Sequence, residues 1–337
     1  MKISYSTSLL HYNTFGIDVI ADCFIEYDSV DDLCSLLQLD IVKSSELLAI
    51  GGGSNLLFLN DFKGVVIHSV YNKIKQVDQD DQHVYLEVGS GVIWDDFVEY
   101  AVENGWGGVE NLSNIPGEVG ASAVQNIGAY GVEVQDVIVT VNAVEIATSK
   151  TKTFSNEACC YAYRQSVFKN ELKGKFIITS VIFRLSKQPN FMLNYQHLEE
   201  EVLKSGAINL RQIRKTIIAI RESKLPDYKL LGNAGSFFMN PVITKQEFEN
   251  LQAKYPTIPH YFVSNTEEKV PAGWLIDQCG WKGKQIGNAA VHDKQALVIV
   301  NKGNATGTEI VYLAEKVQQS VKEKFNIDLT PEVNYIK

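Results

Sequence analysis

The sequence lacks any hydrophobic run long enough to cross a membrane. No stretch of about 18 apolar residues occurs, although hydrophobic residues make up 45% of the 337 positions. The first residues contain one early lysine but no apolar core, so a secretory signal peptide is not expected. We therefore expect a cytoplasmic protein that does not bind membranes, with two or three domains of roughly 100–200 residues each.

Cysteine and histidine are scarce, and neither is spaced as in a disulfide framework or a metal site. The five cysteines are an odd number without a Cys-x-x-Cys pair, and the six histidines show no His-x-x-x-His spacing. Disulfide frameworks need paired cysteines, and zinc sites need closely spaced Cys or His ligands. We therefore expect free thiols and no metal site.

Positive charge is also in short supply. Lysine and arginine number 31 against 40 aspartates and glutamates, which gives a net charge of −9 spread along the chain. Proteins that bind nucleic acids carry a basic patch or stripe. No nucleic-acid partner is therefore expected.

What the sequence does contain is an irregular mixture of helix and strand patterns. Apolar residues at helical spacing predict helices over 30–37, 94–103, 210–221, 245–254, 272–279 and 308–325. Alternating or short apolar runs predict strands over 23–27, 47–50, 64–69, 84–88, 137–147, 175–185 and 296–300. The tail, 328–337, resembles a strand without a local partner. Because the order is not a regular βαβ alternation, an α+β fold is predicted.

A glycine cluster directly follows the predicted strand 47–50. Gly51, Gly52 and Gly53 permit positive φ angles and leave successive backbone N–H groups free to face one anion. The cluster is neither a P-loop nor a dinucleotide-binding fingerprint, because the spacing of both motifs fails. A phosphate cradle and a tight hairpin turn are both compatible with it.

Two further clusters contain mostly small and polar residues. The segment 111–131 is 21 residues of glycine, amides and hydroxyls with little charge, which is long for a connecting turn. Small side chains let a flat polar heterocycle approach the backbone, although a loose loop is the alternative. The segment 231–241 carries Ser236 beside a tight turn, but it is not a nucleophile elbow and no His/Asp spacing supports a hydrolase.

These clusters, in this order, resemble the UDP-N-acetylenolpyruvoylglucosamine reductases (MurB), flavoenzymes of peptidoglycan precursor synthesis. The resemblance covers nearly the whole chain. The matching motifs lie at 13–15, 50–55, 115–131, 161–169, 224–227, 232–238, 272–278 and 331–333.

The resemblance implies a vanillyl-alcohol-oxidase (PCMH-type) FAD-binding fold in two subdomains, plus an α+β substrate-binding domain. The implied domains are 1–70 with 326–337 and 71–215 for FAD, and 216–325 for the substrate. It further implies a monomer that binds FAD non-covalently and takes NADPH as co-substrate. The implied reaction reduces UDP-N-acetyl-3-O-(1-carboxyvinyl)-glucosamine to UDP-N-acetylmuramate for cell-wall biogenesis, cell shape and cell division. Hydride passes from flavin N5 to C3, and a proton reaches C2.

Three catalytic residues follow from matching motifs. Arg164 matches the arginine that stabilises charge on the substrate carboxylate, a role suited to its planar, permanently charged fork. Ser236 matches the donor of the C2 proton, although a free hydroxyl is a weak acid and needs a strongly basic intermediate. Glu332 matches a glutamate that polarises the carboxylate from the other side. A structural ion pair for Arg164, a turn role for Ser236 and a solvent-facing tail position for Glu332 are the alternatives.

The binding residues also follow from the resemblance. Those implied for FAD are Ile50, Gly51, Gly52, Gly53, Ser54, Asn55, Ile115, Pro116, Gly117, Gly120, Ala121, Ser122, Gln125, Asn126, Gly128, Tyr130 and Gly131. Those implied for the UDP-sugar are Tyr195, Lys224, Asn240, Tyr261, Lys282 and Gln295. Tyr261 resembles the tyrosine of a subgroup with a substrate lid.

The sequence departs from the family pattern at Glu118, Ala123 and Met239, where small polar, proline and lysine residues are common. Two other functions are compatible with the sequence. One is an oxidase of the same superfamily, but such oxidases often attach flavin through His or Cys, and the 51–55 loop has neither. The other is a non-enzymatic nucleotide-binding module.

Overall fold

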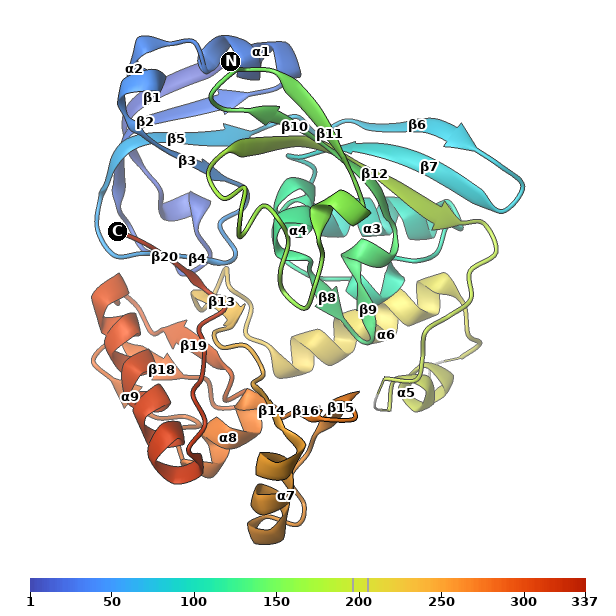
Figure 1. Ribbon diagram of the computed structural model, residues 1–337, viewed down its shortest axis with the longest axis vertical. Helices are drawn as coiled ribbons and strands as arrows, with labels where there is room; N and C mark the ends of the chain where they lie inside the picture. The colour runs from blue at the N-terminus through green and yellow to red at the C-terminus, as the bar shows by residue number, and fades with distance from the viewer. Residues whose placement is uncertain (196, 205) are drawn as a thin grey trace. The chain divides into compact units, whose positions relative to one another are not determined.

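The computed structural model describes residues 1–195, 197–204 and 206–337, which divide into two units. The first unit comprises Met1–Ser8, Ile20–Gly53 and Phe62–Ser223. The second comprises Leu9–Val19, Ser54–Asp61 and Lys224–Lys337 (Figure 1). Each unit is therefore assembled from segments that are far apart in the sequence.

The first sheet of the first unit has the strand order β1-β2-β5-β3. Its strands are β1 (Lys2–Ser8), β2 (Ile20–Tyr27), β5 (Phe62–Ser69) and β3 (Glu46–Ile50). β2, β5 and β3 run parallel, whereas β1 is antiparallel to β2. Parallel strands of one sheet need a crossover connection. α1 (Val30–Leu36) and α2 (Asp40–Ser44) lie in the connection between β2 and β3, which β5 separates in the sheet. The predicted cap is present, because the Ser29 side chain accepts from Asp32 N at 3.1 Å.

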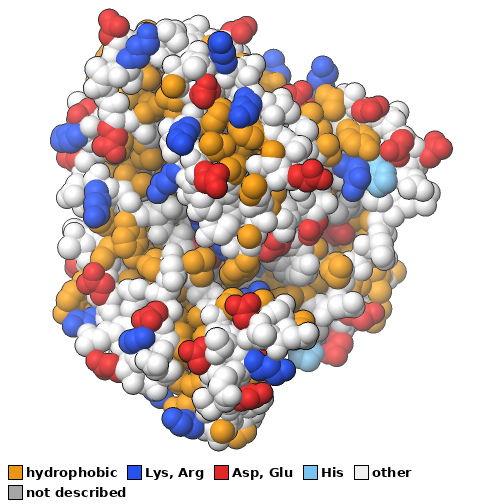
Figure 2. Space-filling view, viewed as in Figure 1, with side chains coloured by type: hydrophobic (Ala, Val, Ile, Leu, Met, Phe, Trp, Pro, Cys, Tyr) orange, Lys and Arg blue, Asp and Glu red, His pale blue; other side chains and the backbone are white. Residues whose placement is uncertain are grey.

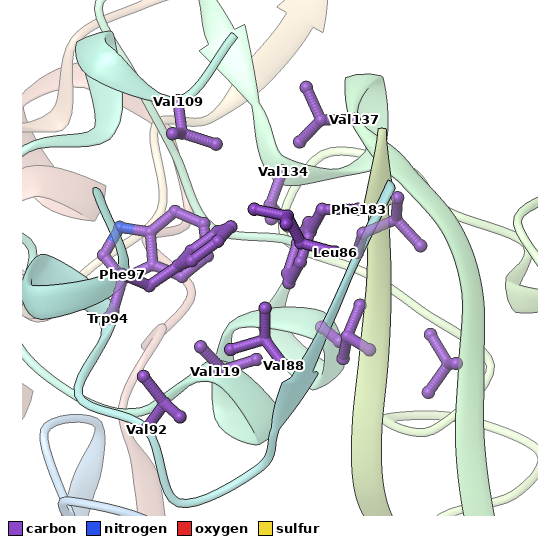
Figure 3. Packing of buried hydrophobic residues seen from close by; sticks show 14 of the residues in the cluster. Leu86, Val88, Val92, Trp94, Phe97, Val109, Val119, Val134, Val137 and Phe183 are labelled. Carbon is purple, nitrogen blue, oxygen red and sulfur yellow. The ribbon is translucent and has the colours of Figure 1, made fainter. Parts of the chain in front are cut away.

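The second sheet of this unit is antiparallel, with the order β11-β10-β12-β7-β6. Its strands are β11 (Thr151–Ser155), β10 (Ile138–Glu145), β12 (Phe176–Ser186), β7 (His83–Gly89) and β6 (Ile74–Gln79). Its core includes residues of α3 (Trp94–Glu103) and α4 (Val119–Gln125). Figure 3 shows Trp94 and Phe97 of α3 beside Phe183 of β12; the ring centroids of Phe97 and Phe183 are 4.7 Å apart.

Further helices and strands complete the first unit. They are η2 (Glu110–Leu112), β8 (Gly128–Ala129), β9 (Val132–Glu133), η3 (Val134–Asp136), η4 (Glu157–Cys159), α5 (Leu198–Lys204) and α6 (Leu210–Lys224), whose last residue belongs to the second unit.

The second unit is built around a sheet of order β13-β19-β18-β17. These strands are β13 (Asn233–Ser236), β19 (Val298–Asn301), β18 (Ala289–Val291) and β17 (Gln285–Ile286). α8 (Ala272–Gln278) packs on α9 (Gly307–Phe325), and α9 lies against β18 and β19. A separate sheet contains β14 (Val242–Thr244), β16 (Glu267–Lys269) and β15 (Tyr261–Ser264), and α7 (Lys245–Lys254) follows β14. η1 (Leu10–Tyr12) begins the first segment of this unit.

The C-terminal tail pairs with a distant strand. β20 (Asn334–Ile336) runs parallel to β4 (Leu56–Phe58), within the second unit. The tail has no strand partner nearby in the sequence. Its partner is β4, which lies close to the other end of the chain.

Most predicted elements are present, and the mixed parallel and antiparallel sheets confirm the α+β class. Within the 111–131 segment, for which no helix was predicted and a loose loop was the alternative, the structure contains α4. Figure 2 shows acidic and basic side chains interspersed on the face that it presents, in keeping with a charge spread along the chain. Throughout the described ranges, no helix is long and apolar enough to cross a membrane.

Candidate active site

The glycine turn after β3 is not a hairpin. β3 pairs with β5 in the first unit, whereas β4, which follows the turn, pairs with β20 in the second. Gly53 has a φ of +62°, a conformation that glycine adopts without steric cost. The hairpin alternative is therefore excluded.

Within the first unit, this turn lies against the second glycine cluster. A Cβ at Gly51 would lie 3.4 Å from Ala121 Cβ, and one at Gly52 would lie 3.4 Å from Gly117 Cα. Two segments that the sequence predicts for FAD thus meet, with glycine at the contact. This arrangement fits a cofactor that approaches the backbone closely.

The second glycine cluster is an ordered structure and not a loose loop. α4 ends at Asn126, which has a φ of 50° and donates to Ala162 O at 2.9 Å. Ser122 Oγ donates to Val119 O at 2.7 Å. Gly120 packs so closely on the preceding turn that a Cβ would lie 2.7 Å from Ser90 Cβ. Ser122 and Asn126 therefore shape the segment through bonds to the protein itself.

Arg164 is attached to the same segment. It has a φ of 57°, and its guanidinium donates to Gly128 O at 2.9 Å and to Asn126 O at 3.4 Å. Lys169 donates to Arg164 O at 2.9 Å and to Gln125 Oε1 at 2.8 Å. The backbone and side chain of Arg164 are thus both fixed to residues predicted to bind FAD.

The sequence did not single out Arg221, a second arginine of this region. Arg221 lies on α6, and its Nε donates to Asn114 O at 3.1 Å. Burial, together with the nearby charge of Arg164, lowers the pKa of this guanidinium. The sequence contains one signal that could have identified Arg221, namely the basic pattern of the predicted helix. Arg214 lies seven residues earlier on the same face of this helix, and in the structure it binds Asp95.

Tyr195, predicted for the substrate, also lies in the first unit. Its ring packs edge-on against Tyr130, with centroids 5.8 Å apart. Burial raises the pKa of the Tyr130 hydroxyl, which therefore stays protonated.

In the second unit the segments that carry Ser236 and Glu332 are joined by a backbone hydrogen bond beside an isolated bridge between Phe238 and Pro331. Ser236 is the last residue of β13, and Glu332 N donates to the carbonyl of the next residue, Phe237, at 2.8 Å. Asn55 Nδ2 donates to Glu332 O at 3.2 Å. Ser236 is therefore a strand residue and not a turn residue, and the backbone of Glu332 is held by hydrogen bonds at both its N–H and its carbonyl rather than lying in a free tail.

The remaining predicted substrate residues belong to the second unit. Asn240 Oδ1 accepts from Ala272 N at 2.9 Å, at the start of α8. Gln295 Oε1 accepts from Leu297 N at 3.4 Å. Lys282 lies 3.9 Å from Asp277. Tyr261 begins β15, and Lys224 ends α6.

The predicted site residues thus divide between the two units. The first holds most of the FAD residues together with Arg164 and Tyr195; the second holds Ser54, Asn55, Ser236, Glu332 and the other substrate residues.

Comparison with known proteins shows the family to which this chain is similar. A family model described as "FAD binding domain" matches residues 21–155, and one described as "UDP-N-acetylenolpyruvoylglucosamine reductase, C-terminal domain" matches 226–336. The UDP-N-acetylenolpyruvoylglucosamine reductase of Bacteroides fragilis is 53% identical over 98% of both chains. That of Flavobacterium johnsoniae is 47% identical over 100% of both.

A solved structure agrees with the fold. The UDP-N-acetylenolpyruvylglucosamine reductase (MurB) of Thermus caldophilus covers 100% of this chain and 98% of its own, with a TM-score of 0.70 at 21% identity. The chain therefore belongs to the UDP-N-acetylenolpyruvoylglucosamine reductase family of FAD-dependent oxidoreductases.

Proposed function

We propose that the protein uses NADPH and non-covalently bound FAD to reduce the enolpyruvyl group of UDP-N-acetylenolpyruvoylglucosamine, giving UDP-N-acetylmuramate for peptidoglycan synthesis. The observation that carries the proposal is the fixing of Arg164 to the predicted FAD segment, since it sets a carboxylate-binding group beside the cofactor. When bound, FAD supplies a hydride carrier between NADPH and the substrate.

The cofactor would be held by the glycine turn 51–53, the adjoining Ser54 and Asn55, and the 115–131 segment. The backbone N–H groups of the turn suit the diphosphate, because consecutive amides without side chains can face one anion. The close approach of Gly52 to Gly117 keeps the two segments together.

Arg164 and Glu332 would act on the substrate carboxylate. Addition of hydride to C3 pushes negative charge onto that carboxylate. A planar guanidinium can bind it in a bidentate manner, and such preorganised donors lower the barrier most where charge develops. Lys169 supports this role because it fixes the Arg164 carbonyl.

Ser236 would deliver the proton to C2. Its position at the end of β13, beside the backbone hydrogen bond between Glu332 and Phe237, leaves this residue exposed. A serine hydroxyl is weakly acidic, so the transfer depends on a basic intermediate and on proton replenishment from water.

Tyr195, Lys224, Asn240, Tyr261, Lys282 and Gln295 would bind the UDP-sugar. Lysine ammonium groups are suited to a diphosphate as point charges. Tyr261, on the β15–β16 hairpin, would close over the substrate as a lid and exclude water. We also propose that 1–70 with 326–337, 71–215 and 216–325 are the functional domains, and that the enzyme acts as a cytoplasmic monomer.

An anaerobic titration tests this function. The purified protein should be yellow, NADPH should bleach it, and UDP-N-acetylenolpyruvoylglucosamine should restore the flavin absorbance. Recolouring by oxygen but not by this substrate would favour the oxidase. A colourless protein that cannot be reconstituted with FAD would contradict both.

The proton-donor role of Ser236 has a separate test. Ser236→Ala should leave bleaching by NADPH near normal but slow recolouring by substrate by about 10²–10⁴-fold, the usual contribution of a general acid. Ser320→Ala, on α9, is the control, because its hydroxyl donates to a helix carbonyl at 2.9 Å. Equal loss in both half-reactions would rule out a specific proton-transfer role.

A further inference from the structure

A buried group of one histidine and two glutamates lies in the first unit, and none of the roles above uses it. His68 Nε2 is 2.9 Å from Glu118 Oε1, and Nδ1 is 3.7 Å from Glu26 Oε1. The three side chains are 12%, 11% and 19% exposed. Charged groups are rarely buried to this degree unless they are paired.

Glu118 of this group faces the glycine turn. A Cβ at Gly51 would lie 3.1 Å from Glu118 Oε2, and one at Gly52 would lie 3.9 Å from Oε1. This chain therefore places an ionisable acid against the turn to which we assign the FAD diphosphate.

A carboxylate at this place creates an electrostatic problem that His68 can solve. An ionised Glu118 repels an anion a few ångströms away, and the repulsion is strong where water is excluded. A protonated imidazole at 2.9 Å cancels that charge. The other groups facing the pair are Glu26, whose Oε2 is 3.7 Å from Lys2 Nζ, and the uncharged rings of Phe24 and Tyr27.

We propose that His68 and Glu118 are positioning residues for FAD: the hydrogen-bonded pair supports the glycine turn, and its shared proton removes the negative charge that would otherwise face the diphosphate. The proposal rests on the assignment of Gly51, Gly52 and Gly53 to the diphosphate. It predicts that the affinity for FAD depends on the protonation of this pair.

The direction of the pH dependence follows from the surroundings of each group. Burial opposes protonation of His68, but the hydrogen bonds and charges of Glu118 and Glu26 outweigh it and raise the pKa of the imidazole. Burial raises the pKa of Glu118. The pair therefore keeps its proton above the ordinary histidine value of 6.5, and FAD binding weakens as the pH rises through the raised value.

Release of FAD from the diluted holoenzyme, followed by flavin fluorescence from pH 6 to 9, tests the proposal. In the parent protein the Kd should rise by about tenfold across the alkaline half of this range, a change of about 1.4 kcal/mol. His68→Asn should remove this rise and bind FAD weakly throughout, since Glu118 then has no cationic partner.

Glu118→Gln should shift the affinity for FAD in the direction opposite to the shift in His68→Asn. Without the carboxylate, the imidazole loses its proton at lower pH, and at pH 9 the variant should bind FAD more tightly than the parent. The control is His83→Asn, a more exposed histidine of β7 beside Asp80, which should reproduce the parent profile. A parent-like profile in His68→Asn, or weaker binding than the parent by Glu118→Gln at pH 9, would overturn the proposal. If His68→Asn does not fold, Glu118→Gln decides alone.

Gly52→Asp separates this proposal from the assignment on which it rests. Its Cβ would make an ordinary contact of 3.4 Å with Gly117 Cα, so the fold should tolerate the change. The new carboxylate should weaken FAD binding at every pH. Unchanged binding would show that the turn does not hold the diphosphate, whatever the profiles of the two pair variants.

Discussion

Arg164 shows how a single residue is prepared for its proposed task by its neighbours. A non-glycine residue with a φ of 57° is uncommon and needs support from its surroundings. Lys169 supplies it by donating to Arg164 O at 2.9 Å and to Gln125 Oε1 at 2.8 Å. One ammonium group thus connects the arginine backbone to the FAD segment.

Lys169→Met should slow the substrate half-reaction selectively. The guanidinium would lose its fixed backbone, and a misplacement of about 1 Å can cost about 10²-fold in rate. Stopped-flow measurements should show near-normal bleaching by NADPH, slower recolouring by substrate, and partial rescue in Lys169→Arg. Lys173→Met, on an exposed turn of the same segment, should behave as the parent. Equal slowing of both half-reactions would contradict the positioning role.

The sequence predicts individual site residues only through their motifs. Composition and spacing favour a turn role for Ser236 and a tail position for Glu332, because Ser236 is placed by strand pairing with Val298 and Glu332 by a backbone hydrogen bond to Phe237, both distant in the sequence. For the same reason, the sequence does not identify Arg221 as a site residue. The position of its guanidinium depends on a hydrogen bond to Asn114, which is far from it in the sequence. No local sequence pattern indicates such a contact.

At the scale of elements, sequence periodicity and capping residues predict the helices and strands that have an apolar face or a cap. The helix expected over 94–103 is present with the same bounds, since its apolar residues repeat at helical spacing. Periodicity does not predict α4, because its sequence, VGASAVQ, is dominated by small residues and shows no contrast between an apolar and a polar face. The glycine turn also needed the structure, since its character depends on which strands pair with β3 and β4.

Gly232→Ala should destabilise the second unit. A Cβ at this position would collide with the backbone carbonyl of Phe15, where Asn233 N donates to Thr14 O at 2.9 Å. Neither backbone can move freely, because Asn301 Nδ2 also donates to Phe15 O at 2.9 Å. We expect a loss of about 1–3 kcal/mol in the free energy of unfolding, as for other overpacked sites.

Chemical denaturation at saturating FAD measures this loss. Gly273→Ala is the matched control, since its nearest contact would be the flexible end of Gln295 at 3.1 Å and alanine favours the α8 helix. Its free energy of unfolding should stay near the parent value. Equal losses in both variants would show that the Phe15 contact is not the cause.

At the scale of the whole molecule, stability depends on pH through the groups whose pKa differs between folded and unfolded states. Below pH 6.5 these effects oppose one another, because burial lowers the pKa of His292 whereas it raises the pKa values of the carboxyls Glu110 and Glu118. Burial raises the pKa of the Cys159 thiol to about 11, so this thiol contributes only at alkaline pH. Between about pH 6.5 and 8.5 the raised pKa of His68 sets the direction of the pH dependence. The pKa values of the buried carboxyls Glu118 and Glu110 are raised as well, which acts in the same direction.

The free energy of unfolding should therefore fall as the pH rises through this interval. A raised pKa means that the folded state binds more protons than the unfolded state, so the derivative with pH is negative, by at most about 1.4 kcal/mol per pH unit for each proton. The stabilisation from His68 is complete below its ordinary value of 6.5 and is lost above its folded value. Urea unfolding at fixed, saturating FAD should show this decline in the parent and in His83→Asn, but a shallower one in His68→Asn. A slope unchanged by His68→Asn would mean that the imidazole does not hold its proton more tightly in the folded protein, and stability would then have to depend on the buried carboxyls alone.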